Sequence, residues 1–165
     1  MSLSSFKLDG RVALITGSSS GIGFALARGI GEAGATLVLN GRHKTRLEAA
    51  ASILRGEGLQ VHTRAFDATQ RTEVVEAVDD IEASIGPLDI LVNNAGMQRR
   101  MPLEDFPAED WHELMRTNVD SVFLVGQSVA RKMIARAFGK IINICSVQSE
   151  LVGLALPPTW PARAP

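Results

Sequence analysis

The sequence has little cysteine and no tyrosine: Cys145 is its single thiol among 165 residues. A lone cysteine cannot form an internal disulfide, which excludes the secreted scaffolds that disulfide frameworks hold together. Because tyrosine is absent, no phenolic hydroxyl is available for proton transfer. Any acid or base chemistry in these residues therefore depends on other side chains.

Long apolar runs and an excess of one charge are also missing. No apolar stretch approaches the roughly 20 residues that span a bilayer, and residues 1–10 lack the apolar centre of a secretory signal. The 17 basic and 18 acidic residues are interspersed, so no strong field attracts nucleic acid or anionic lipid. We expect a cytoplasmic protein with a small-molecule partner, no metal, and no membrane or nucleic-acid partner.

What is present is a regular alternation of two patterns. Short apolar, partly β-branched runs, typical of strands buried on both faces, lie at residues 12–16, 36–40, 60–65, 88–92 and 140–145. Segments with helical spacing lie at residues 22–33, 43–55, 71–85 and 108–136. This order predicts a doubly wound, Rossmann-type α/β fold with a parallel sheet of five strands.

The last residues differ from the rest. Four of the seven prolines fall within residues 151–165, and neither a helix nor a central strand tolerates that density. We expect residues 1–150 to form one domain and residues 151–165 to be an unstructured tail.

A glycine-rich turn joins the first expected strand to the first expected helix. Such a turn permits tight bending and close approach to a pyrophosphate, while the helix N-terminus offers free N–H groups to the anion. A plain glycine-rich connection is the alternative, but the position favours dinucleotide binding by residues 1–150. The expected contacts are Gly17, Ser19, Ser20, Gly21, Ile22 and Gly23.

The end of the second expected strand indicates which dinucleotide binds. About 20 residues after the turn, where an acid would hold the ribose 2′-hydroxyl of NAD, the sequence reads Asn40-Gly41-Arg42. A guanidinium there can pair with the 2′-phosphate of NADP, which a carboxylate would repel. The alternative is a solvated arginine beside Lys44 and Arg46. We favour NADP, with Arg42 as the ligand of its 2′-phosphate.

Two motifs resemble the short-chain dehydrogenase/reductase family. Residues 16–23 follow the pattern Thr-Gly-x-x-x-Gly-Ile-Gly, and residues 93–96 read Asn-Asn-Ala-Gly directly after an apolar strand. The resemblance extends over residues 8–150. The alternative for residues 93–96, taken alone, is a polar turn. The alternative for Asp67 is an acidic residue of no special role, since acidic residues are common after strands. The resemblance implies further cofactor contacts at Asp67, Ala68, Asn94, Ala95 and Gly96.

The resemblance also implies an oxidoreductase. Hydride transfer between an alcohol or ketone and nicotinamide requires a proton to move at the carbon oxygen. In the family a tyrosine moves it, a serine binds the substrate oxygen and an asparagine holds a water of the proton relay. The matching positions are Ser146 and Asn118, for which a strand-terminating hydroxyl and a helix kink are the plain alternatives.

The family's Tyr-x-x-x-Lys motif is absent, since the chain has no tyrosine and no lysine after Lys140. In the family this motif follows the serine closely. The corresponding position in this chain lies within the proline-rich residues. Back-translated with permitted codons and shifted by two bases, residues 153–165 can encode Tyr-x-x-x-Lys at that interval. The hypothesis is a frameshift after about Leu151 that removes the C-terminal part of the fold and leaves the chain catalytically incompetent. The nucleotide sequence tests this hypothesis.

Residues 93–100 and 141–151 resemble the gluconate 5-dehydrogenase branch of the family. A sugar acid carries a carboxylate, which Arg100, or else Arg99, can bind as a planar fork; two surface arginines are the plain alternative. A lineage that reduces 3-oxoacyl thioesters or other ketones, and an inactive cofactor-binding remnant, stay open. The resemblance implies a homo-oligomer that pairs partly through residues 108–136. We do not expect it in this chain, because the other half of that interface follows the lost motif.

Overall fold

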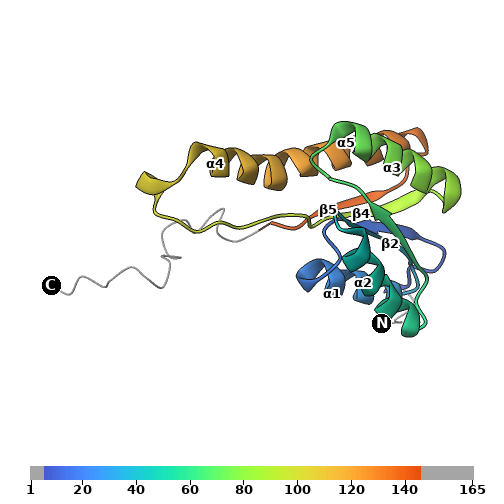
Figure 1. The fold of residues 1–165 in the computed structure, drawn as a ribbon. Helices are drawn as coiled ribbons and strands as arrows, with labels where there is room; N and C mark the ends of the chain where they lie inside the picture. Colours follow the sequence, from blue (N-terminus) through green and yellow to red (C-terminus); the bar gives the residue numbers. More distant parts are fainter. Residues whose placement is uncertain (1–5, 146–165) are drawn as a thin grey trace.

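The centre of the molecule is a parallel sheet of five strands in the order β3-β2-β1-β4-β5. The computed structural model describes residues 6–145. Its strands are β1 (Val12–Ile15), β2 (Thr36–Gly41), β3 (Val61–Ala65), β4 (Leu88–Asn93) and β5 (Lys140–Asn143). The chain runs outward from β1 to β3 and then returns to β4 on the other side of β1, so the winding reverses between β1 and β4 (Figure 1). The predicted doubly wound fold is confirmed.

Helices cover both faces of this sheet. A cluster of buried apolar residues lies on each face, and four helices contribute to these two cores. They are α1 (Gly21–Glu32), α2 (Lys44–Gly56), α3 (Arg71–Ser84) and α5 (Ser121–Ala135). The first two lie on one face and the last two on the other (Figure 1). A short 3-10 turn (Leu103–Asp105), helix α4 (Ala108–Met115) and a π-helical turn (Arg116–Asp120) precede α5. The long helix expected at residues 108–136 is therefore present, with an interruption at the turn that contains Asn118.

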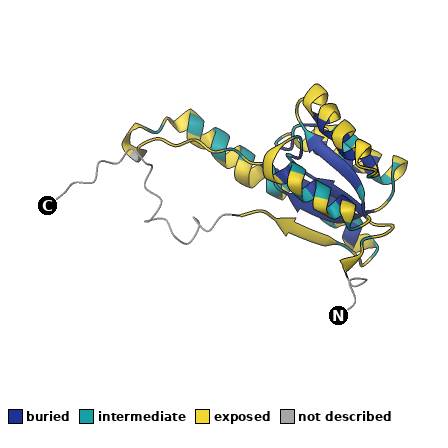
Figure 2. Ribbon diagram, turned by 90° about the horizontal axis from the view of Figure 1, so that it is seen from below, coloured by how far each residue is buried: buried dark blue, intermediate teal, exposed yellow. Residues whose placement is uncertain are grey.

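Side chains alternate across β1 and feed two cores. Val12 and Leu14 pack with the helices α3 and α5, whereas Ala13 and Ile15 pack with α1 and α2. Burial of one large apolar side chain stabilises a fold by about 1.5–3 kcal/mol, so both faces need apolar residues. This requirement explains the unbroken apolar runs of the central strands, which are buried in Figure 2.

A buried carboxylate fixes the register of β1 against β4. The pairing of the two strands shifts by one residue at Asp89. The carboxylate of Asp89 accepts the N–H of Val12 at 3.0 Å and a guanidinium N–H of Arg11 at 3.2 Å. A buried charge is tolerated when it is paired in this way. The C-terminal ends of these two strands are thereby aligned, and the candidate site lies between them.

Strand β5 is an exposed edge strand, although its apolar run is of the kind typical of strands buried on both faces. Its neighbour is β4 alone within residues 6–145, and Ile141, Ile142 and Ile144 expose 41%, 47% and 41% of their surface. Figure 2 shows this strand exposed along its length. β3 is likewise only partly buried, because it forms the opposite edge. An apolar edge with free backbone groups promotes association with other chains.

Replacing Ile142 by lysine should therefore raise solubility, because a charged edge residue blocks edge-to-edge pairing. We expect the concentration at which light scattering detects aggregates to rise by roughly threefold or more. The matched control is Ile53→Lys, which adds the same charge to an equally exposed isoleucine of α2. An equal gain in both variants would assign the effect to net charge and not to the β5 edge.

Candidate functional site

The glycine turn lies between the central strand β1 and the N-terminus of α1, as the sequence predicted. Gly17 and Gly21 have φ of +63° and +60°, a backbone region that costs glycine little and other residues more. A Cβ on Gly17 would lie 2.9 Å from the Cα of Ala95. The turn therefore lies directly against the segment that follows β4.

The side chain of Asn94 fastens that segment to the turn. Its Nδ2 donates to the carbonyl oxygens of Thr16 at 3.0 Å and Gly17 at 3.2 Å. The N–H groups of Asn94 and Ala95 both donate to Oγ1 of Thr16 at 3.0 Å. Asn94 thus supports the turn from below and does not line the cleft described next.

Gly23 leaves the space that this amide occupies. A Cβ there would lie 2.4 Å from Nδ2 of Asn94 and 2.5 Å from the carbonyl oxygen of Gly17. Gly23 is buried, whereas Gly21 and Ile22 at the helix start are exposed. The third glycine of the motif is therefore required by the polar contacts between the turn and β4.

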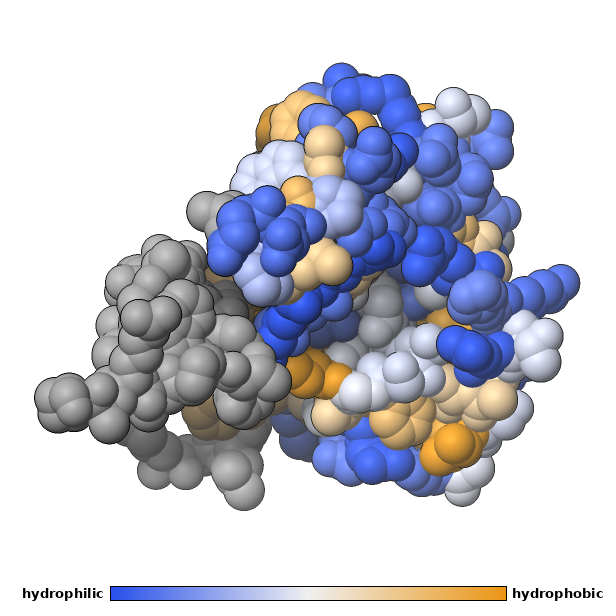
Figure 3. Space-filling view, turned by 60° about the vertical axis from the view of Figure 1, so that its left-hand side comes forward, coloured by the Kyte–Doolittle hydropathy of each residue, from blue (hydrophilic) through white to orange (hydrophobic). Residues whose placement is uncertain are grey.

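A cleft of about 300 Å³ opens above the turn, at the C-terminal ends of the strands. In Figure 3 the surface is hollowed between an upper, largely hydrophilic part and a lower part. Eight of the predicted cofactor contacts line the cleft, namely Gly17, Ser19, Ser20, Arg42, Asp67, Ala68, Ala95 and Gly96. The other four, Gly21, Ile22, Gly23 and Asn94, do not line it.

The three serines of the turn have different roles. Ser18 is buried, and its Oγ donates to the carbonyl oxygen of Ile15 at 2.8 Å and accepts the N–H of Asn40 at 3.0 Å. Ser19 and Ser20 line the cleft, and neither hydroxyl has a hydrogen bond with the part of the chain that the structure describes. Ser18 therefore joins β1 to β2, while the other two serines face the cleft.

The end of β2 presents a cation and no carboxylate to the cleft. Asn40 is buried, and its Nδ2 donates to the carbonyl oxygens of Arg64 at 3.3 Å and Phe66 at 3.0 Å. Gly41 and Arg42 follow, and both line the cleft. Arg42 is exposed and forms no ion pair within residues 6–145.

Asp67 and Ala68 form the wall of the cleft beyond β3. Oδ1 of Asp67 accepts the N–H and the hydroxyl of Thr69 at 2.9 and 2.8 Å. This local turn fixes the carboxylate, and its second oxygen, which receives no hydrogen bond from residues 6–145, can accept one from a ligand.

Sequence reasoning missed other residues of the cleft wall. They come from three parts of the fold and are Asn40, Gly41, His43, Phe66, Thr69, Thr117 and Ser121. Thr117 and Ser121 lie four residues apart on the helical segment of Asn118, so the helical period gave a usable signal. Ser121 is buried and donates to the carbonyl oxygen of Thr117 at 2.6 Å.

The amide of Asn118 is fully engaged by one neighbour. Its Oδ1 accepts the N–H of Met97 at 2.8 Å, and its Nδ2 donates to the carbonyl oxygen of Met97 at 2.9 Å. The side chain therefore ties the segment after β4 to the π-helical turn. Ser146, the other predicted catalytic residue, lies outside the described residues.

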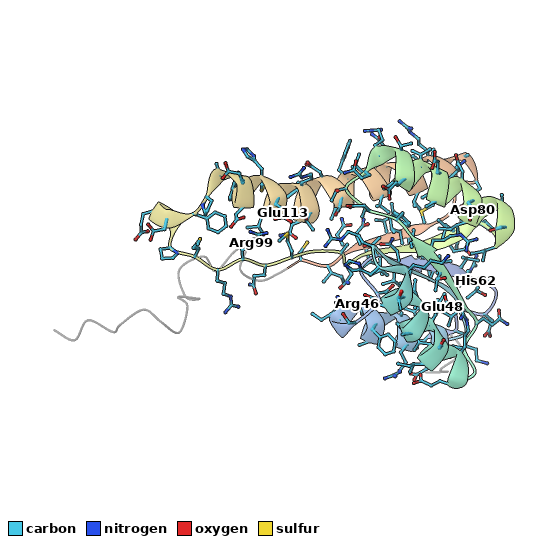
Figure 4. All side chains as sticks on the ribbon, viewed as in Figure 1. Arg46, Glu48, His62, Asp80, Arg99 and Glu113 are labelled. Atoms are coloured by element: carbon cyan, nitrogen blue, oxygen red, sulfur yellow. The ribbon has the colours of Figure 1, made fainter. Side chains whose placement is uncertain are left out.

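The structure separates the two predicted substrate arginines. The guanidinium of Arg99 pairs with the carboxylates of Asp110 and Glu113 on α4 (Figure 4). Hydrogen bonding to Asp110, together with the nearby charge of Glu113, raises the pKa of Arg99. Arg100 is exposed, and the described region offers it no ion pair. Of the two, only Arg100 has a guanidinium free for another carboxylate.

Two kinds of feature are absent from the described residues. No group of three or more His, Cys, Asp or Glu side chains within residues 6–145 is placed to hold a metal ion. None of the helices in that range is long and apolar enough to cross a membrane.

A glycine turn against a helix N-terminus, at the reversal point of a doubly wound parallel sheet, defines the Rossmann class of nucleotide-binding domains. The family model described as short chain dehydrogenase matches residues 11–158. The chain belongs to this family of oxidoreductases.

Relatives with known names support the same assignment. The chain is 54% identical over 153 residues to gluconate 5-dehydrogenase of Gluconobacter oxydans, covering 93% of this chain and 60% of that protein. It is 49% identical over 146 residues to 5-keto-D-gluconate 5-reductase of Escherichia coli, covering 88% and 58%.

A solved structure is similar as well. It is a gluconate 5-dehydrogenase from Burkholderia cenocepacia in complex with NADP and tartrate, with 57% identity and a TM-score of 0.85 over 88% of this chain and 57% of that one. The chain thus spans about 60% of the length of the curated relatives it matches.

Proposed function

We propose that residues 1–150 form a domain that binds NADP(H), in a lineage of enzymes that interconvert gluconate and 5-ketogluconate. One observation carries the cofactor choice: the end of β2 presents Arg42, with no acidic partner among the described residues and no carboxylate at position 41. NADP in the Burkholderia complex supports the same choice.

The cleft offers a partner for each part of the dinucleotide. Backbone N–H groups at Gly21 and Ile22, with the hydroxyl of Ser20, bind the pyrophosphate at the start of α1, and the hydroxyl of Ser19 contacts the 2′-phosphate. Arg42 binds the 2′-phosphate. The adenine lies beside Asp67 and Ala68, while Ala95 and Gly96 form the floor next to the turn, which Gly17, Gly23 and Asn94 shape.

The bound cofactor supplies a hydride donor or acceptor, and proton transfer is left to the protein. Within this chain Asn118 orders residues 96–97, and Ser146 is proposed to bind the substrate oxygen. No tyrosine is present to move the proton. We therefore propose that these 165 residues bind cofactor without turning over substrate.

The boundary at residue 150 and the frameshift after Leu151 belong to the same proposal. The match to the family model extends past this boundary, to residue 158, and does not locate the frameshift. The nucleotide sequence of the gene tests it directly. A coding sequence without Tyr and Lys codons in both alternative frames over residues 151–165 would refute the frameshift. Size-exclusion chromatography tests the related prediction that this chain does not form the family's oligomer.

The proposed substrate is a sugar acid, and Arg100 is its carboxylate ligand. Identities of 54% and 49% to enzymes named for gluconate and 5-ketogluconate support this choice over a 3-oxoacyl or other ketone. The free guanidinium of Arg100 supports it chemically, because a planar fork suits a carboxylate. Arg99 is left to its two partners on α4.

Calorimetric titration of the 165-residue chain tests the cofactor assignment. We expect NADP to bind about tenfold or more tightly than NAD, because a charge-assisted contact to the 2′-phosphate is lost with NAD. Gluconate with NADP should give no measurable reduction of the nicotinamide. Equal affinity for the two cofactors would contradict the assignment to NADP, and turnover at an ordinary rate would contradict the lack of catalysis.

A further inference from the structure

We propose that Arg46, in the first turn of α2, is a second cation for the 2′-phosphate and a determinant of NADP specificity in this chain. This inference rests on the proposed function, because it assumes that NADP occupies the cleft. It adds to Arg42, which follows β2, a second residue that lies on α2. If Arg46 did not contact the phosphate, the assignment of the cofactor would still stand.

The position of Arg46 relative to the turn is the first argument. A second hollow, of about 450 Å³, runs between α1 and α2 and adjoins the cofactor cleft, because Ser19 and Ser20 line both. Arg46 lines this second hollow, whereas Arg42 lines the cofactor cleft. The two serines therefore belong to the walls of both hollows, with Arg42 in one hollow and Arg46 in the other. Figure 4 labels Arg46 where α2 adjoins α1.

The other residues that line the second hollow do not compete with a bound anion for the guanidinium of Arg46. Its other walls are Phe24, Ala49, Ala50 and Ile53, which provide no side-chain acceptor. Because these walls provide no acceptor, an anion bound beside Ser19 in the cofactor cleft would be the acceptor available to the guanidinium of Arg46. A guanidinium binds phosphate oxygens through paired N–H donors, which the hydroxyl of Ser19 can supplement.

The pairing of charges across the molecule is the second argument. Arg28, Arg55 and Arg64 on the same half of the sheet each pair with a carboxylate. Within the part of the chain that the structure describes, Arg42 and Arg46 have no such partner. Arg42 also lines a third hollow that contains Glu109, Asp110 and Glu113, whereas no acidic side chain lines the hollow of Arg46. A basic side chain in such surroundings attracts an anion.

The absence of acid around this end of α2 points the same way. The first turn of α2 contains no acidic residue. Glu48, the next acid along the helix, has its carboxylate engaged by Arg55 and Thr63. Neither hollow includes an acidic side chain apart from Asp67, at the adenine side of the cofactor cleft. A doubly charged 2′-phosphate between Ser19 and Arg46 would meet no carboxylate from these walls.

The test compares Arg46→Gln with Lys44→Gln. Both substitutions remove one positive charge from the first turn of α2, but Lys44 lines neither hollow. The probes are NADP, NAD and adenosine 2′,5′-bisphosphate, titrated calorimetrically into the 165-residue chain. We expect Arg46→Gln to weaken NADP and the bisphosphate by about tenfold and NAD by less than about twofold. Lys44→Gln should weaken all three by less than about twofold, since a solvated lysine that lines neither hollow makes no direct hydrogen bond to the phosphate.

Arg46→Lys separates charge from geometry and should retain most of the affinity for NADP. Equal losses in Arg46→Gln and Lys44→Gln would overturn the proposal in favour of a general field. A loss for NAD as large as that for NADP would also overturn it, because the contact would then lie at another phosphate. Failure of the unaltered chain to bind either cofactor would instead refute the proposed function. A melting temperature equal to that of the unaltered chain confirms that each variant is folded.

Discussion

Alanine at position 23 is expected to destabilise the domain and to abolish measurable NADP binding. The added Cβ would lie 2.4 Å from Nδ2 of Asn94 and 2.5 Å from the carbonyl oxygen of Gly17, so one of them has to move. Overpacking of this kind costs about 1–3 kcal/mol. Displacement of the Asn94 amide also removes its two hydrogen bonds to the turn, each worth about 1 kcal/mol. Thermal denaturation and cofactor titration measure the two effects.

The matched control lies in the same helix. Gly29 has no atom within 4 Å of the position its Cβ would take, so Gly29→Ala should leave cofactor affinity unchanged. It should raise the free energy of unfolding by up to about 1 kcal/mol, because alanine favours a helix interior over glycine. If Gly23→Ala behaved like Gly29→Ala in both measurements, the contact between Asn94 and the turn would not have the importance assigned to it.

Aspartate at position 41 should reverse the cofactor preference. A Cβ there would meet Oγ of Ser19 and Cδ1 of Leu47 at 3.6 Å, an ordinary contact, so the fold accommodates a side chain. The new carboxylate would repel each negative charge of the 2′-phosphate by about 2–3 kcal/mol at a separation of about 5–8 Å and an effective dielectric constant of about 20, before screening by salt. We expect NADP affinity to fall about 50- to 100-fold and NAD affinity to be retained or improved, as measured by calorimetry.

Gly41→Asn is the control for size, since it adds the same number of heavy atoms without the charge. It should weaken NADP by less than about fivefold, because no like-charge repulsion is introduced. If asparagine weakened NADP as strongly as aspartate, crowding beside Ser19 and not charge would explain the loss. Combining Gly41→Asp with Arg42→Ala should weaken NADP further than either change alone.

Local patterns were sufficient to predict the sheet and the glycine turn. Each central strand is an apolar run, and each motif residue lies within a few positions of a strand end, so chain order alone places it. A helix kink at Asn118 was one alternative that the sequence left open. Residues 16–23 are dense in Gly and Ser, and residues 93–96 are dense in Asn and Gly, which left few alternative structures.

Contacts between distant segments could not be predicted in this way. Nothing local indicates that Arg99 pairs with Asp110 and Glu113 across the chain, or that the amide of Asn40 turns toward β3. The apolar pattern of β5 alone does not distinguish it from a buried strand, since burial of an apolar strand depends on what covers it.

Residues 94–97 are held at both ends by asparagine amides. Asn94 fastens one end to Thr16 and Gly17, and Asn118 fastens the other through Met97. A ligand that rigidifies the turn therefore also lowers the entropy of the path leading to the π-helical turn. Displacement of the glycine turn is therefore expected to be transmitted to the π-helical turn through these four residues.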